Sequence, residues 1–209
     1  MEKLKKTDII CQKYELIKKS FHKSQLIKTA QLKALKLYYK DIVALTEKGY
    51  LEKIKQGYYR IVNADDDPSE AQIIKQLYPD GVLCMYTALF YYGYSDRTPL
   101  DWDIAINRDT SKARFNIDYP YVKPYYMEAK HLQYGVTQAE YEDYTLKIFD
   151  RDRLICECIH NENKMDLETY NKAIQGYVND SKKSVSNLIE CAKKRGMLKK
   201  VNKRIGVWL

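Results

Sequence analysis

The stretch from Thr29 to Val62 constrains the fold of this chain more than any other. It begins with residues of helical spacing, passes through a short turn at Lys36-Leu37 into a second helical segment, and ends in two short strands. Gly49 stands where a left-handed residue ends the second helix, and Lys55-Gln56-Gly57 forms the turn between the strands. This order of elements predicts a winged helix-turn-helix, a module that reads DNA.

The apolar positions assign an inner side to each predicted helix. Residues 3–20 have helical spacing and predict a supporting first helix. The second helix begins near Thr29, its predicted N-cap, and turns Leu32 and Leu35 inward. In the strands, Leu51 and Ile54 and then Tyr59 and Ile61 are the predicted inward positions.

The third helix is the predicted recognition helix. Leu37, Ile42 and Leu45 form its buried stripe, which leaves Tyr38-Tyr39-Lys40 and Val43 near the exposed N-terminal end. Lysines there supply phosphate contacts, and tyrosines bond phosphate or pack against sugars and thymine methyl groups. The predicted DNA-binding residues are Lys28, Thr29, Gln31, Lys33, Tyr38, Tyr39, Lys40, Lys53, Lys55, Gln56 and Tyr58.

A polar, acidic segment that ends in proline, Asn63 to Pro68, marks the clearest boundary in the chain. It predicts a winged-helix domain over 1–63 and a second domain over 68–209. The second domain mixes short strands, such as Trp102–Ile106, with helical segments, and it is helical after Met165. The predicted fold class is α+β: a winged helix followed by a larger mixed α/β domain that ends in helices.

Charge is distributed in three blocks. Residues 1–60 hold 15 Lys and Arg against 6 Asp and Glu, residues 61–180 hold 12 against 21, and residues 181–209 hold 9 against 1. Basic ends around an acidic middle favour a polyanionic partner, although a surface rich in lysine is also common without one. No apolar run reaches the roughly 18 residues that a membrane span needs. Five scattered cysteines are typical of a reduced, cytoplasmic protein, so we expect a cytoplasmic location.

Enzyme motifs are weak. The three histidines lack partners at motif spacing, and Cys156-x-Cys158 is too short for a redox or zinc pair, which favours core packing. Asp101-Trp102-Asp103 resembles the paired carboxylates of a metal-dependent nucleotidyltransferase, but Gly93-Tyr94-Ser95 is not the phosphate-binding turn that this chemistry needs. We therefore expect the two carboxylates to face water at a strand end, and we predict no catalytic residue, metal or cofactor.

Several segments together resemble the AbiEi antitoxins of bacterial AbiE, type IV, toxin-antitoxin systems. The winged helix of that family is resembled by three segments, Lys28–Leu32, Glu47–Ile54 and Gln56–Ile61. Tyr86–Asp96 is similar to the family pattern S-A-L-x-x-H-G-L-T-D. Leu146–Glu157 resembles the strand and helix in which the family usually has the pattern E-R-T-L-x-D. The chain departs from the family at three places: Lys36 stands at a frequent glycine, Tyr92 at a histidine, and Asp150-Arg151-Asp152-Arg153 at P-E-R-T.

The resemblance implies a protein with two roles. The winged helix would bind double-stranded DNA at inverted repeats in its own promoter and repress the operon. The C-terminal domain would neutralise a nucleotidyltransferase-like toxin until phage infection. The charge pattern adds a hypothesis of a second basic DNA face, made by Lys193, Lys194, Arg195, Lys199, Lys200, Lys203 and Arg204.

Two other functions stay open at this point. One is a free-standing winged-helix regulator whose C-terminal domain senses a ligand in a pocket lined by the tyrosine-rich stretch Tyr119–Tyr126. The other is an enzyme that uses Asp101 and Asp103, and it is the weakest of the three. A winged helix that binds protein instead of DNA is a further alternative for the N-terminal module.

Overall fold

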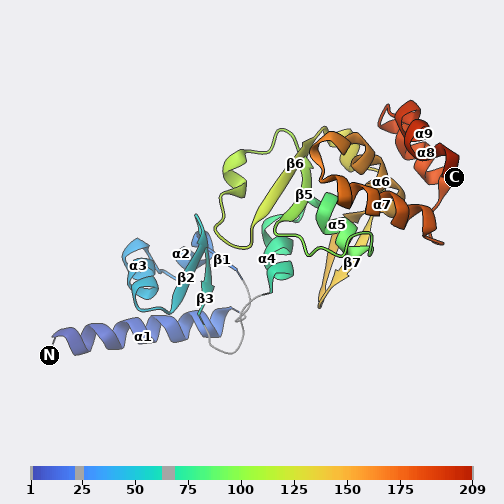
Figure 1. The fold of residues 1–209 in the computed structure, drawn as a ribbon. Helices are drawn as coiled ribbons and strands as arrows, with labels where there is room; N and C mark the ends of the chain where they lie inside the picture. The colour runs from blue at the N-terminus through green and yellow to red at the C-terminus, as the bar shows by residue number, and fades with distance from the viewer. Residues whose placement is uncertain (1, 22–25, 63–68, 209) are drawn as a thin grey trace. The chain divides into compact units, whose positions relative to one another are not determined.

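The computed structural model describes residues 2–21, 26–62 and 69–208, with side chains from residue 9 onward. It separates into two compact units, one made by residues 1–77 with 116–119 and the other by residues 78–115 with 120–209. The predicted boundary at Asn63–Pro68 lies outside the described residues, so the domain limits 1–63 and 68–209 stay a prediction. The predicted α+β class is confirmed by the presence of helices and two separate sheets (Figure 1).

Unit 1 has the element order of a winged helix. Its sheet is antiparallel with strand order β1-β3-β2, and the pair β2–β3 forms the wing. The elements are α1 (Glu2–Ser20), β1 (Ile27–Lys28), α2 (Thr29–Ala34), α3 (Tyr39–Glu47), β2 (Leu51–Lys55), β3 (Tyr58–Ile61) and α4 (Glu70–Leu77).

The core of unit 1 joins the first helices to the sheet. Leu32 and Leu37, both predicted to face inward, are fully buried, whereas Leu35 packs at the margin of the core. Tyr14 of α1 stacks on Tyr50 with ring centroids 4.4 Å apart, which fixes α1 against the start of the wing. The buried cluster consists of Ile17, Ile27, Leu32, Leu37, Ile42, Leu45, Leu51 and Ile61.

The turns of unit 1 follow from single residues. Gly49 adopts a φ of 72°, the left-handed conformation expected of the residue that ends α3, and the N–H of Tyr50 bonds the carbonyl of Leu45 at 2.9 Å. Ile54 faces inward three residues after Leu51 because the pairing register shifts between Lys53 and Lys55.

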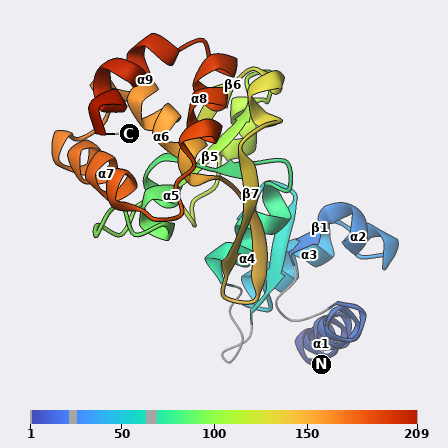
Figure 2. The same ribbon diagram turned by 90° about the vertical axis from the view of Figure 1, so that its right-hand side faces the viewer.

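Unit 2 is built on a mixed sheet with strand order β6-β5-β4-β8-β7. Helices follow the last strand, as the sequence predicts for the C-terminal part (Figure 2). Its strands are β4 (Val82–Leu83), β5 (Trp102–Asn107), β6 (Val122–Met127), β7 (Val136–Tyr141) and β8 (Tyr144–Phe149). Its α-helices are α5 (Met85–Tyr91), α6 (Arg151–His160), α7 (Leu167–Asn179), α8 (Val185–Lys194) and α9 (Leu198–Ile205). Short 3₁₀ turns lie at Lys112–Phe115, Ala129–Leu132, Glu162–Lys164 and Gly206–Trp208.

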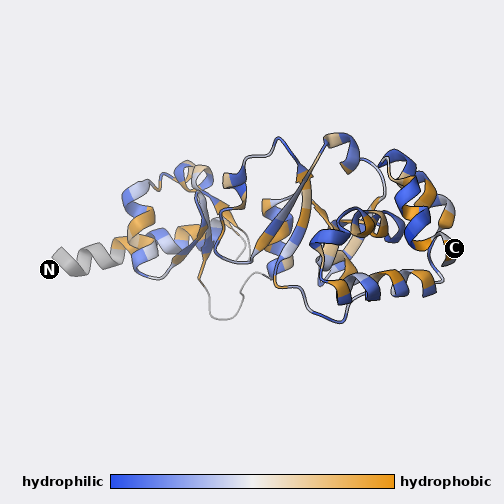
Figure 3. Cartoon of the chain, turned by 45° about the horizontal axis from the view of Figure 1, so that its top comes forward, coloured by the Kyte–Doolittle hydropathy of each residue, from blue (hydrophilic) through white to orange (hydrophobic). Residues whose placement is uncertain are grey.

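Each of the C-terminal helices has an apolar and a polar side (Figure 3). Tyr177 of α7, Leu188 of α8 and Val201 of α9 are fully buried, which places the apolar sides against the rest of unit 2. Cys156 and Cys158 are buried in α6, so the prediction that they are core residues is confirmed. All five cysteines are free thiols. Within the described part of the chain, no helix combines the length and apolar character needed to cross a bilayer.

One expectation about β5 is wrong. The strand was predicted to be half-buried, with Asp103 facing water, yet residues 103–106 are all buried because β5 lies inside the sheet between β4 and β6. Asp103 is only 1 % exposed, and an oxygen of its carboxyl group accepts the N–H of Tyr86 at 2.8 Å. It thus satisfies a donor in the first turn of α5, a capping role supplied from another element.

Candidate nucleic-acid interface

The N-terminus of α3 is held in place by a relay of polar contacts. Lys13 of α1 forms an ion pair of 2.5 Å with Asp41, and the other carboxylate oxygen of Asp41 accepts the N–H of Tyr38 at 2.9 Å. The hydrogen bond from Lys13, followed by that from Tyr38, lowers the pKa of Asp41 below its usual value. The supporting helix therefore fixes the end of α3 that the sequence assigned to DNA.

Two tyrosines project from this fixed end into solvent. Tyr38 is 61 % exposed and Tyr39 is 79 % exposed, and Lys40 beside them is also exposed. Neither ring packs in the core of unit 1. Large exposed aromatic rings next to lysine suit contacts with phosphate, sugar and base edges. Val43, the fourth residue expected there, is half-buried.

The turn before α3 is strained. Lys36 has a φ of 61°, in the left-handed region that costs most residues free energy and that glycine adopts readily. This is the position at which the sequence departs from the frequent glycine of the family. Lys36 is exposed, two residues before Tyr38 in the chain.

The start of α2 differs from its prediction by one residue. Lys28, not Thr29, is the N-cap, because Lys28 ends β1 and pairs with Tyr58 of the wing. The side-chain carbonyl of Gln31 accepts the N–H of Lys28 at 2.8 Å. Gln31 is a predicted DNA-binding residue, but its side-chain oxygen is used to cap α2. Lys33 is exposed on the last turn of α2.

The wing carries a small basic and aromatic cluster. The ammonium groups of Lys28 and Lys55 lie 5.8 and 6.0 Å from the ring centroid of Tyr58. The side chain of Tyr58 is half-buried. Only the pairing of β1 with β3 brings Lys28 to this place, since the two residues are distant in the sequence. Gln56 is exposed at the tip.

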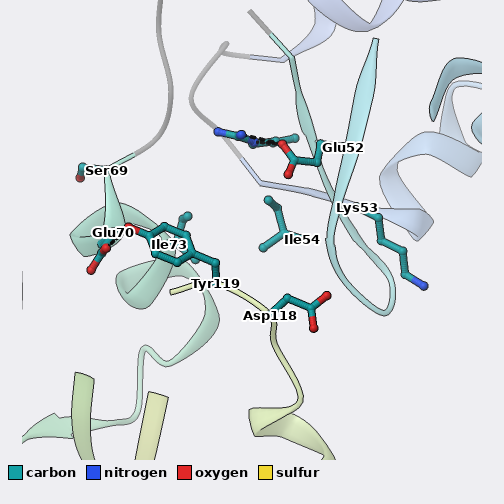
Figure 4. Close-up of a pocket in the computed structure, with 9 residues that line it drawn as sticks. Glu52, Lys53, Ile54, Ser69, Glu70, Ile73, Asp118 and Tyr119 are labelled. Carbon is teal, nitrogen blue, oxygen red and sulfur yellow. Dashed lines mark hydrogen bonds and ion pairs between the residues drawn. The ribbon is translucent and has the colours of Figure 1, made fainter. Parts of the chain in front are cut away.

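Several carboxylates lie around a cavity beside the wing. A cavity of about 400 Å³ in unit 1 is lined by Lys53 and Ile54 together with the carboxylates of Glu52, Glu70 and Asp118 (Figure 4). An ion pair joins Arg60 to Glu52 in its wall, and Tyr119 bonds Glu70. Lys53 borders this cavity, but its side chain points away from the carboxylates (Figure 4). A lining of this charge does not suit a polyanion.

The predicted second basic face in unit 2 is largely compensated by carboxylates. Arg195 pairs with the buried Glu157 at 2.9 Å, and Lys194 pairs with Glu190 at 2.6 Å. Lys200 and Arg204 both pair with Glu162, at 3.3 and 2.6 Å. Among the described residues, only Lys193, Lys199 and Lys203 of the seven have no carboxylate partner and are exposed.

Unit 2 also contains a cavity of about 290 Å³ beside Asp103. Lys123 of β6 lies opposite Asp103 in the sheet, and its ammonium group is 5.8 Å from the ring of Tyr86. Burial raises the pKa of Asp103 to about 7, against the opposing effects of the Tyr86 N–H and of Lys123. Within the described residues, no group of three metal-binding side chains occurs here or elsewhere.

Sequence reasoning did not identify Lys13 and Asp41 as part of the interface. A signal for Asp41 was present, because a carboxylate three residues after a predicted helix start is one half of a capping box. Lys13 had no such signal, since its role depends on how α1 packs against α3.

In unit 1, supporting helices hold α3, whose N-terminal end is exposed and basic, and a β-hairpin wing follows α3. This arrangement defines unit 1 as a winged helix-turn-helix of the DNA-binding regulator class. Residues 15–62 match the family model described as "Transcriptional regulator, AbiEi antitoxin". The predicted resemblance of the winged helix to the AbiEi antitoxins is therefore confirmed for these residues. A search of curated proteins found no match to the chain.

Proposed function

We propose that the chain is the antitoxin and autorepressor of a type IV, AbiE-like toxin-antitoxin operon, and that unit 1 binds inverted repeats in the promoter of that operon. The observation that carries the DNA-binding part is the exposure of Tyr38 and Tyr39 beside Lys40 at the clamped end of α3. Two copies on two repeats would match a two-fold operator, since each winged helix reads one half-site.

Binding to the upstream DNA tests this part directly. The variant Tyr38→Ala, Tyr39→Ala, Lys40→Ala is compared with the wild type by fluorescence anisotropy on the duplex that precedes the gene. Loss of the phosphate and base contacts should weaken binding by about 100-fold or more. The matched control is Lys48→Ala, an exposed lysine at the other end of α3, which should change affinity little. Equal affinities for the wild type and the triple variant would mean that α3 is not the recognition helix.

For unit 2 we propose neutralisation of a cognate nucleotidyltransferase-like toxin. The support is the resemblance of Tyr86–Asp96 and Leu146–Glu157 to the corresponding segments of the family, since the family match itself ends at Val62. Co-expression provides the test. The adjacent nucleotidyltransferase gene should arrest growth alone and be tolerated with this chain. Tolerance should persist in the DNA-binding triple variant, because the two roles fall on different units. Growth arrest despite ample expression of this chain would refute the antitoxin role.

One observation favours a second candidate, a regulator that senses a ligand. The cavity beside Asp103 includes Lys123, which belongs to the tyrosine-rich stretch that the sequence suggested as a pocket lining. A ligand bound there would change promoter affinity. Thermal unfolding of the purified chain against a set of nucleotides and amino acids tests the idea, and an unchanged Tm with every compound counts against it.

A further inference from the structure

The two edges of the sheet in unit 2 differ in how they meet solvent. At the two ends of β6, the carbonyls of Tyr121 and Met127 accept hydrogen bonds of 2.8 Å from the N–H groups of Trp102 and Arg108, at the two ends of β5. Odd-numbered residues of β6 therefore face β5, and even-numbered residues, Pro124 at the centre among them, face outward. Proline has no N–H, and an outward proline prevents another strand from pairing with this edge.

At β7, on the opposite edge, no proline blocks the outward residues. The carbonyl of Gly135 accepts the N–H of Asp150 at 2.9 Å, so odd-numbered residues face β8. The outward residues are then Val136, Gln138 and Glu140. Their exposed edge offers the main-chain groups of a strand to any extended chain that can lie beside it.

Few of these outward groups are satisfied within the described residues. The N–H of Glu140 donates to the hydroxyl of Tyr91 at 3.3 Å, a long hydrogen bond that a pairing strand can replace. The N–H groups of Val136 and Gln138 have no protein partner in the described part of the chain, where β7 pairs with β8 alone. The edge is therefore open over most of the strand.

The charge around this edge selects its partner. Glu140 lies on β7, and Glu142 and Asp143 form the tip of the hairpin between β7 and β8 (Figure 2). None of these three carboxylates has an ion-pair partner among the residues that the structure describes, although Glu140 accepts the hydroxyl of Thr145 at 3.0 Å. An extended segment that carries lysine or arginine would satisfy both the main-chain groups and the carboxylates.

We propose that the open edge of β7 binds an extended basic segment of a partner protein, which adds to the sheet as an additional strand. Main-chain bonds to Val136 and Gln138 supply affinity, and the carboxylates of Glu140, Glu142 and Asp143 supply the preference for basic residues. This interaction is independent of the DNA-binding surface, and it does not depend on the identity of the partner as a toxin.

The test uses the full chain and two synthetic octapeptides, one alternating lysine and threonine and the other alternating glutamate and threonine. The basic peptide should bind in a saturable way and slow the amide hydrogen exchange of Val136 and Gln138 by about tenfold or more at saturation. The acidic peptide should bind at least about tenfold more weakly. Equal binding of the two peptides, or protection that excludes β7, would overturn the proposal.

Variants separate edge pairing from charge alone. Gln138→Pro removes an outward N–H and should abolish binding of the basic peptide, whereas Val122→Pro on the closed edge should not. The variant Glu140→Lys, Glu142→Lys, Asp143→Lys keeps the main-chain edge and should reverse the preference, favouring the acidic peptide. Retention of the original preference would contradict the role of these carboxylates. If Gln138→Pro instead converted a dimer into a monomer, the edge would belong to a second copy of this chain.

Discussion

Single residues at turns and strand ends set local strain in this protein. Lys36 has a φ of 61°, so Lys36→Gly should raise the free energy of unfolding of unit 1 by ~0.5–1 kcal/mol through relief of the left-handed conformation. The control Lys48→Gly removes the same charge at a residue with a φ of −82° and should destabilise or change nothing. Denaturant unfolding of both variants measures the difference. A loss of stability in Lys36→Gly would show that the lysine side chain makes a compensating contact.

The buried carboxyl of Asp103 gives a second prediction at the residue scale. Its pKa of about 7 lies above the 3.8 of an ordinary aspartate, so the folded chain keeps the proton while the unfolded chain loses it. The contribution of Asp103 to stability is thus fully present below pH 4 and falls as the pH rises to about 7. Asp103→Asn should remove this decline, because the amide oxygen still accepts the Tyr86 N–H without titrating. Unfolding midpoints of the wild type and of Asp103→Asn, measured between pH 4 and 8, test this prediction. The same dependence of the midpoint on pH in both proteins would contradict it.

Among the elements, α6 depends most on buried charge. Arg153 is fully buried, forms an ion pair of 2.6 Å with Glu157 and lies between the rings of Tyr134 and Phe149. Gly135 makes this possible, since a Cβ there would lie 2.5 Å from the Cβ of Arg153. Two nitrogens of Arg153, Nε and Nη1, have no hydrogen-bond partner among the described residues. The guanidinium therefore depends on Glu157, on the carbonyl of His131, which accepts from Nη2 at 3.3 Å, and on the two rings for its stabilisation.

Removing the charge of Glu157 should consequently be costly. Glu157→Gln leaves Arg153 and Arg195 without their shared carboxylate, and we expect a loss of ~3 kcal/mol in the free energy of unfolding. The control Glu190→Gln breaks the exposed pair with Lys194 and should cost less than about 1 kcal/mol. Similar losses in both variants, measured by urea unfolding, would mean that the buried pair contributes little beyond an exposed one.

At the scale of the whole molecule, the charge blocks predict how DNA binding depends on salt. Replacing Lys193, Lys199 and Lys203 with glutamine should reduce the slope of log K against log salt by up to about 3, if each contacts one phosphate. The matched variant Lys194→Gln, Lys200→Gln, Arg204→Gln should reduce it less, because those side chains already pair with Glu190 and Glu162. An unchanged slope in both variants would remove unit 2 from the DNA interface.

The sequence by itself determined the order of the first three helices and the two wing strands of unit 1, and the side of α3 that faces solvent, but it did not predict β1. Helical spacing, Gly49 and the position of Tyr38 and Tyr39 are local features, and local features depend on neighbours in the chain. The same holds for the helices after Met165, which the structure confirms as α7, α8 and α9.

Only the tertiary structure decided which of these residues act together. It brought Lys28 to Tyr58, Lys13 to Asp41 and Glu157 between two arginines, and it buried Asp103, which the sequence had placed in water. It also left β7 as an open edge, although its residues alone do not show whether a neighbouring strand exists. Each of these outcomes depends on contacts between segments that are distant in the sequence, and short-range spacing carries no information about such contacts.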